Sequence, residues 1–193
     1  MIAAVPSSTV LGRERIDGGI VLLTLNRPAA RNGLSHALLA ELIGALASIG
    51  NDTAVRAVIL AGQGPAFCAG HDLKELTARR DDPDGGRAFF EAAWDQCCTM
   101  MQMIVGLPQP VIACVNGAAT AAGCQLVATC DLAVAREGAA FSTPGVNIGL
   151  AGASAVPAGY LGQRYWPVVL ARSLDQMTRA AFLAVGRGAP RKT

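Results

Sequence analysis

Short apolar blocks alternate with polar turns along the first 150 residues, and their spacing predicts alternating strands and helices. Residues 10–16 and 20–25 are β-forming runs on either side of an Asp-Gly-Gly turn at residues 17–19, which predicts a β-hairpin. Ser35 precedes leucine and isoleucine positions at helical spacing, so it predicts a capped, amphipathic helix.

The later blocks repeat an order of strand followed by helix. Residues 55–61, 111–115 and 132–135 are apolar runs that predict buried strands. Residues 87–104 and 124–130 have the spacing of helices, and the first of these ends before two prolines. Strands separated by helices favour an α/β class with parallel strands and right-handed crossovers.

Composition narrows the function classes. The 193 residues are 52% hydrophobic, which is enough apolar surface for one buried core. No run of about 18 apolar residues occurs, so no membrane span is expected. The net charge of +2, without a clustered basic stripe, argues against a nucleic-acid partner.

Cysteine usage bears on metal binding and on the compartment. The six cysteines form no CxxC pair, so no metal site is expected. Cys114, Cys124 and Cys130 lie among valine, alanine and leucine, where a reduced thiol behaves as a small apolar side chain. Reduced cysteines and an amino terminus without a signal-peptide pattern predict a cytoplasmic location.

The charge balance changes near residue 150. Residues 1–150 contain 10 Lys or Arg and 13 Asp or Glu, whereas residues 151–193 contain six and one. We therefore expect a core over residues 1–150 and a divergent basic tail over residues 151–193. The break in charge coincides with a break in sequence pattern, which motivates the hypothesis that the tail results from truncation or a frameshift.

Two glycine-rich turns carry the candidate chemistry. Residues 66–75 and residues 116–125 each follow a predicted strand and lead into a helix. Backbone N–H groups at a helix start have no partner within the helix and suit a negatively charged oxygen. Two such turns facing each other would form an oxyanion hole, whereas the alternative is that the glycines only permit tight turns.

Four strings occur in order: LNRPAARN, AFCAGHDLKEL, PVIACVNGAATAAGCQLVATCDLAVA and FSTPGVNIGL. Together, over residues 8–150, they resemble the enoyl-CoA hydratase/isomerase, or crotonase, family. The resemblance implies a crotonase-like spiral of ββα units, here expected to lack the carboxyl-terminal helical part that builds the family's trimer or hexamer. It also implies an acyl-CoA substrate of fatty acid metabolism, with coenzyme A as part of the substrate and no separate cofactor. Because animal members are mitochondrial, the mitochondrial matrix is the alternative location.

The resemblance assigns roles by position. The oxyanion amides would belong to His71 and to Ala122, which stands where the family frequently has glycine, so the turn must tolerate a Cβ there. Arg31 or Lys74 would meet the CoA phosphates. The remaining residues expected to bind substrate are Ala30, Ala69, Gly70, Asp72, Leu73 and Gly123.

The sequence departs from the family at the two glutamates that position water and move protons. Gln125 and Gly145 stand there, and neither side chain exchanges a proton at neutral pH. Loss of general acid or base help costs roughly 10²–10⁴-fold in rate for each group. Three hypotheses stay open: a lyase or isomerase acting through enolate stabilisation, an acyl-CoA-binding protein without turnover, and an inactive truncated product.

Other residues offer weak substitutes for the glutamates. His36 lies in the capped helix, where a packing role is expected. Asp72 is expected to cap a short helix, and Cys124 lacks a histidine partner that would activate it. Asn147 is a candidate hydrogen-bond donor to an acyl group. Phosphate-loop, HExxH and GxSxG motifs are missing, which excludes the corresponding enzyme classes.

Overall fold

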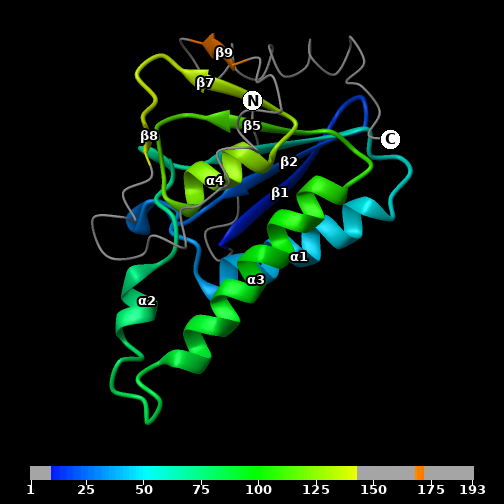
Figure 1. The fold of residues 1–193 in the computed structure, drawn as a ribbon. Helices are drawn as coiled ribbons and strands as arrows, with labels where there is room; N and C mark the ends of the chain where they lie inside the picture. The colour runs from blue at the N-terminus through cyan, green and yellow to red at the C-terminus, as the bar shows by residue number, and fades with distance from the viewer. Residues whose placement is uncertain (1–9, 143–167, 172–193) are drawn as a thin grey trace.

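The computed structural model describes residues 10–142 and 168–171, which form two sheets and four α-helices (Figure 1). The larger sheet has the strand order β1-β2-β3-β5-β7-β9, and the smaller has the order β4-β6-β8. The strands are β1 Leu11–Ile16, β2 Ile20–Leu25, β3 Ala57–Gly62, β4 Ala66–Cys68, β5 Val111–Val115, β6 Ala118–Thr120, β7 Leu132–Arg136, β8 Phe141–Ser142 and β9 Val168–Ala171. The helices are η1 Pro28–Ala30, α1 His36–Gly50, α2 Leu73–Thr77, α3 Arg87–Gly106 and α4 Ala122–Thr129.

The larger sheet confirms the hairpin and the parallel strands that the hydrophobic pattern predicts. β1 and β2 pair antiparallel with Ile16 opposite Ile20. Every other pair in this sheet, from β2 with β3 to β7 with β9, is parallel. Parallel neighbours require crossover connections, and α1, α3 and α4 supply these between successive strands.

Helix α1 begins where the sequence predicts. The Oγ of Ser35 accepts a hydrogen bond from the backbone N–H of Leu38 at 3.2 Å. A second cap comes from α2, because the Glu75 carboxylate accepts from the backbone N–H of His36 at 3.0 Å. The start of α1 is thereby attached to the helix that follows the first glycine-rich turn.

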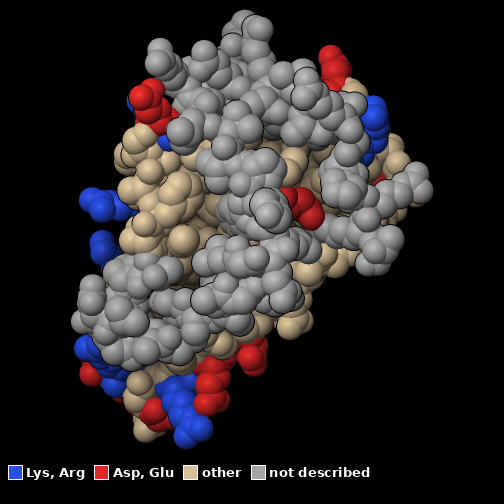
Figure 2. Space-filling model, turned by 45° about the horizontal axis from the view of Figure 1, so that its top comes forward, with Lys and Arg blue, Asp and Glu red and all other residues tan. Residues whose placement is uncertain are grey.

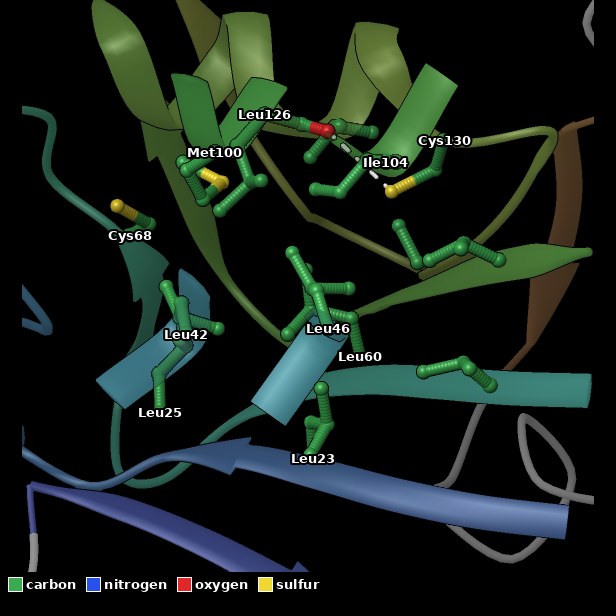
Figure 3. Close-up of a cluster of buried hydrophobic side chains, with 14 of the residues drawn as sticks. Leu23, Leu25, Leu42, Leu46, Leu60, Cys68, Met100, Ile104, Leu126 and Cys130 are labelled. Carbon is green, nitrogen blue, oxygen red and sulfur yellow. Dashed lines mark hydrogen bonds between the residues drawn. The ribbon is translucent and has the colours of Figure 1, made fainter. Parts of the chain in front are cut away.

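The main core lies between one face of the larger sheet and the helices, and α1 and α3 run side by side there (Figure 1). Figure 3 shows leucines of the sheet facing α1, with side chains from α3 and α4 closing the cluster. Its labelled members are Leu23, Leu25, Leu42, Leu46, Leu60, Cys68, Met100, Ile104, Leu126 and Cys130. Alternate strand positions, among them Ile20, Ile59 and Ile112, form a second cluster on the opposite face. Burying each large side chain contributes about 1.5–3 kcal/mol before conformational entropy is subtracted.

The smaller sheet is a feature that the hydrophobic pattern alone does not predict. Its strands β4, β6 and β8 have only two or three residues each and pair in parallel. β4 directly follows β3, β6 follows β5, and β8 follows β7. The chain therefore repeats a unit of two strands, with a helix after β4 and after β6, as the resemblance implies.

The surface of the described residues carries charges of both signs. Figure 2 shows Lys and Arg beside Asp and Glu at the lower end of that face. Two ion pairs lie on exposed residues, Arg79 with Asp82 and Arg87 with Glu91. Within residues 10–142 and 168–171, no helix has both the length and the apolar character to cross a membrane.

Candidate functional site

A parallel β-bridge between Leu34 and His71 attaches the first glycine-rich turn to the segment before α1. Leu34 donates its N–H to the Gly70 carbonyl at 2.7 Å and accepts from the Asp72 N–H at 3.1 Å. In a parallel bridge of this kind, the residue between the two that bond to the partner strand directs its own N–H away from that strand. The His71 N–H therefore points away from Leu34, and no hydrogen bond among the described residues uses it.

The second turn joins β6 to α4. The Ala121 N–H donates to the Ser142 carbonyl at 2.8 Å, which fixes the entry into the helix. Ala122 is the first helical residue, so its N–H has no carbonyl partner within α4, and none is found elsewhere in the described part of the chain. The left-handed φ of 49° falls on Ala121, whereas the alanine at the predicted oxyanion position, Ala122, is helical and buried.

The two turns touch each other. The Thr120 hydroxyl donates to the Ala69 carbonyl at 3.0 Å. A Cβ added to Gly70 would lie 3.3 Å from the Ala122 nitrogen, and one added to Gly123 would lie 2.1 Å from the Cys68 carbonyl oxygen. Glycine at these two positions allows the approach, and the approach brings the amides of His71 and Ala122, both without a partner in the described part of the chain, into one locality.

Asp72 has a structural role, as predicted. Its Oδ1 accepts from the backbone N–H groups of Lys74 at 3.0 Å and Glu75 at 3.4 Å, which caps α2. Its Oδ2 lies 2.7 Å from the Arg27 guanidinium, and this pair is largely buried. Burial acts to raise the pKa of Asp72, but the Arg27 hydrogen bond and charge and the two N–H groups outweigh it and lower the pKa.

Asn32 is a site residue that sequence reasoning missed. Its amide nitrogen donates to the carbonyls of Gln63 and Ala66, both at 2.9 Å, and its Oδ1 accepts from the Arg27 N–H at 2.8 Å. Asn32 is fully buried with a left-handed φ of 54°. Asparagine at a left-handed position is a detectable signal, because its short amide tolerates that backbone. The residue fastens the loop of Ala30 and Arg31 to the start of β4.

The His71 side chain faces α3. Its imidazole stacks on Trp94, with ring centroids 5.4 Å apart and an interplanar angle of 20°, and Trp94 stacks in turn on Phe90 at 5.8 Å. Burial lowers the pKa of the His71 imidazole, so the ring is neutral at pH 7. An aromatic row thus runs from the first turn along α3 to the exposed Phe90.

The remaining predicted site residues lie around these turns. Gln125 is half-buried in the first turn of α4 and bonds through its backbone to the Ala121 carbonyl at 3.1 Å. Burial raises the pKa of the neighbouring Cys124 thiol, which agrees with the interpretation of an inert cysteine. Leu73, Lys74, Ala30 and Arg31 are exposed. Gly145, Asn147 and the boundary at residue 150 lie outside the described residues.

Comparison with known proteins decides the family. The family model described as enoyl-CoA hydratase/isomerase matches residues 15–172. The chain belongs to the enoyl-CoA hydratase/isomerase family. This confirms the resemblance and the crotonase-like α/β fold, because solved structures of the family superpose on most of the chain. An enoyl-CoA hydratase from Mycobacterium smegmatis aligns with a TM-score of 0.76 at 38% identity, covering 92% of this chain and 76% of that one.

Within the enoyl-CoA hydratase/isomerase family, several relatives share one name. Human mitochondrial enoyl-CoA hydratase domain-containing protein 3 is 44% identical over 132 residues, which cover 68% of this chain and 42% of that protein. The rat protein of that name is 42% identical over 140 residues, covering 72% and 45%. The human structure has a TM-score of 0.75 and covers 92% of this chain and 76% of that one, at 33% identity. This chain spans about half the length of the curated relatives it matches.

Proposed function

We propose that this chain binds an acyl-CoA thioester and stabilises negative charge on the thioester oxygen, as a lyase or isomerase of the enoyl-CoA hydratase type. The observation that carries the proposal is the contact between two turns, each with an amide, at His71 and Ala122, that has no hydrogen-bond partner among the described residues. Each such donor stabilises an oxyanion by about 3–4 kcal/mol when it is preorganised. Coenzyme A enters as part of the substrate, and fatty acyl-CoA metabolism is the proposed setting.

The exposed residues beside the first turn suit the CoA moiety. Arg31 and Lys74 are exposed, and neither side chain forms an ion pair with the described residues. A free guanidinium or ammonium group is suited to a phosphate. Ala30, Arg31, Leu73 and Lys74 form the proposed CoA contact, and Ala69, Gly70 and Gly123 shape the backbone that receives the thioester.

Acyl-CoA binding without turnover is the second candidate function. Gln125 favours it, because an amide cannot accept a proton from water at neutral pH. A trimer or hexamer is proposed from the family alone. For the compartment, the word mitochondrial in the names of the human and rat relatives supports the matrix, and the reduced cysteines support either the matrix or the cytoplasm.

The test is a calorimetric titration of the whole chain with a medium-chain 2-enoyl-CoA, followed for a slow heat of turnover. The informative variant is Ala122→Pro, because proline is favoured at the first helical position and has no N–H. We expect saturable binding by the parent, weaker thioester binding by the variant, and equal binding of free coenzyme A by both. No binding by folded parent protein would refute the proposal.

A further inference from the structure

Hydration or isomerisation of an enoyl thioester requires a group that moves a proton, and few described residues near the two turns qualify. Asp72 is ionised and engaged with Arg27 and the start of α2. The thiols of Cys68 and Cys124 are both buried enough to stay protonated, with the pKa of Cys68 raised to about 12. Among these side chains, the His71 imidazole is the one that can act as a neutral base at pH 7, because burial lowers its pKa from the ordinary value.

The position of the His71 imidazole suits proton transfer to a bound thioester. It belongs to the residue whose backbone N–H is the first proposed oxyanion donor, so a thioester bound there is within a side chain's length of the ring. Neither ring nitrogen of His71 has a hydrogen-bond partner among the described residues. Neither belongs to the buried side-chain nitrogen and oxygen atoms there that lack a partner. As far as residues 10–142 and 168–171 are concerned, the ring can therefore accept a proton from a bound water without first breaking another hydrogen bond.

Trp94 fixes where the ring lies. The stacked contact at 5.4 Å holds the imidazole plane against α3 and restricts its rotation. The other histidine has the opposite environment. His36 packs on Phe89 at 4.6 Å, and its Nε2 is buried without a partner. Among the described residues, His36 thus has a buried ring nitrogen without a partner, whereas the ring of His71 stacks on Trp94 and belongs to the residue of the first proposed oxyanion amide.

We propose that the His71 imidazole, held against Trp94, is the proton-transferring group of this site and takes the role for which the family's glutamates are missing. The inference rests on the proposed function and adds the catalytic group to it. His71 then acts twice: its amide binds the thioester oxygen and its ring moves the proton. Trp94 is a positioning residue.

The hydration step balances with water alone. The imidazole accepts a proton from water while the water oxygen bonds to C3 of the enoyl group. The electron pair of the C2–C3 double bond moves toward C2 and the thioester oxygen, where the amides of His71 and Ala122 hold the enolate charge. The imidazolium then returns the proton to C2, which yields a 3-hydroxyacyl-CoA and restores the neutral ring.

Substitution separates the two roles of His71, because every replacement except proline keeps the backbone N–H. We expect His71→Gln to lower kcat for a medium-chain 2-enoyl-CoA by about 10²–10⁴-fold, the usual contribution of general acid–base catalysis. The calorimetric Kd should change by less than about threefold, because the oxyanion amide is retained. The matched control is His36→Gln, which should keep the parent kcat.

A pH profile tests the same assignment without relying on a variant. The parent kcat should fall on the acidic side along a limb with its midpoint below 6.5, since the burial of His71 lowers its pKa. That limb should be lost in His71→Gln and kept in His36→Gln. Trp94→Phe preserves an aromatic partner and should preserve the rate, whereas Trp94→Ala should lower kcat without weakening thioester binding.

Each alternative outcome has a distinct meaning. A His71→Gln variant that turns over within about threefold of the parent overturns the inference. A parent that binds the thioester but forms no 3-hydroxyacyl-CoA, detected by mass, also overturns it while leaving acyl-CoA binding intact. Failure of the folded parent to bind refutes the proposed function itself. Should His71→Gln fail to fold, a parent profile without an acidic limb decides against the inference.

Discussion

Replacing Asn32 by alanine tests how the loop before α1 is attached to the first glycine-rich turn. The substitution removes the two donors to the carbonyls of Gln63 and Ala66 and the acceptor of the Arg27 N–H. The same loop positions the turn, because the Arg31 carbonyl accepts the Ala69 N–H at 3.0 Å. A loosened loop should therefore affect both the stability and the site.

The expected loss follows from the burial of each partner. The bond to Ala66 is buried, and an unpaired buried acceptor costs about 1–3 kcal/mol. The bonds to Gln63 and Arg27 are partly buried, so each contributes about 0.5–1.5 kcal/mol. The left-handed φ of 54° suits asparagine better than alanine by about 1 kcal/mol. Together these give a destabilisation of about 3–7 kcal/mol, a large part of the roughly 5–15 kcal/mol typical of a domain.

Urea unfolding of the parent and of Asn32→Ala, with equal slopes, gives the difference in free energy of unfolding. Arg31→Ala is the matched control, because Arg31 also has a left-handed φ, of 49°, but its exposed side chain has no hydrogen bond among the described residues. We expect the control to change stability by less than about 0.5 kcal/mol. A loss below about 1 kcal/mol in Asn32→Ala would refute the claim that this side chain joins the two loops.

Three further predictions concern the turns. Ala121→Gly should stabilise the chain by about 0.5–2 kcal/mol in urea unfolding, because the strain of a left-handed alanine exceeds the added backbone entropy of glycine, and a destabilised variant would contradict this. The lowered pKa of Asp72 means that its ion pair with Arg27 adds stability above the unfolded-state pKa, and this is lost as pH falls through the folded-state pKa. Asp72→Asn should therefore show a shallower fall in melting temperature between about pH 5 and pH 2 than the parent, and an equal fall would contradict the assignment. Gln125→Glu combined with Gly145→Glu should increase hydration of a 2-enoyl-CoA if the scaffold is competent, measured as 3-hydroxyacyl-CoA formed, and an unchanged rate would show that the two positions do not reach the substrate.

Local pattern predicts five strands of the larger sheet and the helices between them, because each has enough residues to show a period. It does not predict β9, which lies within the segment expected to be a divergent tail. The cap at Ser35 and the buried run of β5 can be identified from the sequence. The smaller sheet cannot, because β4 and β6 have three residues each and their alanines fit a turn as well as a strand. Their pairing depends on contacts between segments about 50 residues apart, which no local window contains.

The candidate site, like the fold, can be predicted from the sequence only in part. The two glycine-rich turns can be located from the sequence, and the resemblance names His71 and Ala122. The ion pair of Arg27 with Asp72 and the three bonds of Asn32 depend on loops that meet only in the folded chain. From the sequence, the strain in the second turn is expected at Ala122, which carries a Cβ where the family frequently has glycine. In the structure Ala122 is the first residue of α4, and the positive φ belongs to Ala121 before it.

A site built from backbone amides separates binding from proton transfer. Gly123, where a Cβ would lie 2.1 Å from the Cys68 carbonyl oxygen, and Gly70, at a φ of 91°, let the two turns approach, so in the proposed function they set the positions of the amides of His71 and Ala122. The proton-transferring group is under no such constraint, because any titratable side chain within reach of the bound thioester can serve. Under the proposed function, glutamine at position 125, where the resemblance implies a glutamate, removes one carrier of the proton without altering the amides. Whether the chain turns over its substrate then depends on a single further side chain, which is why His71→Gln and Ala122→Pro should fail in different assays.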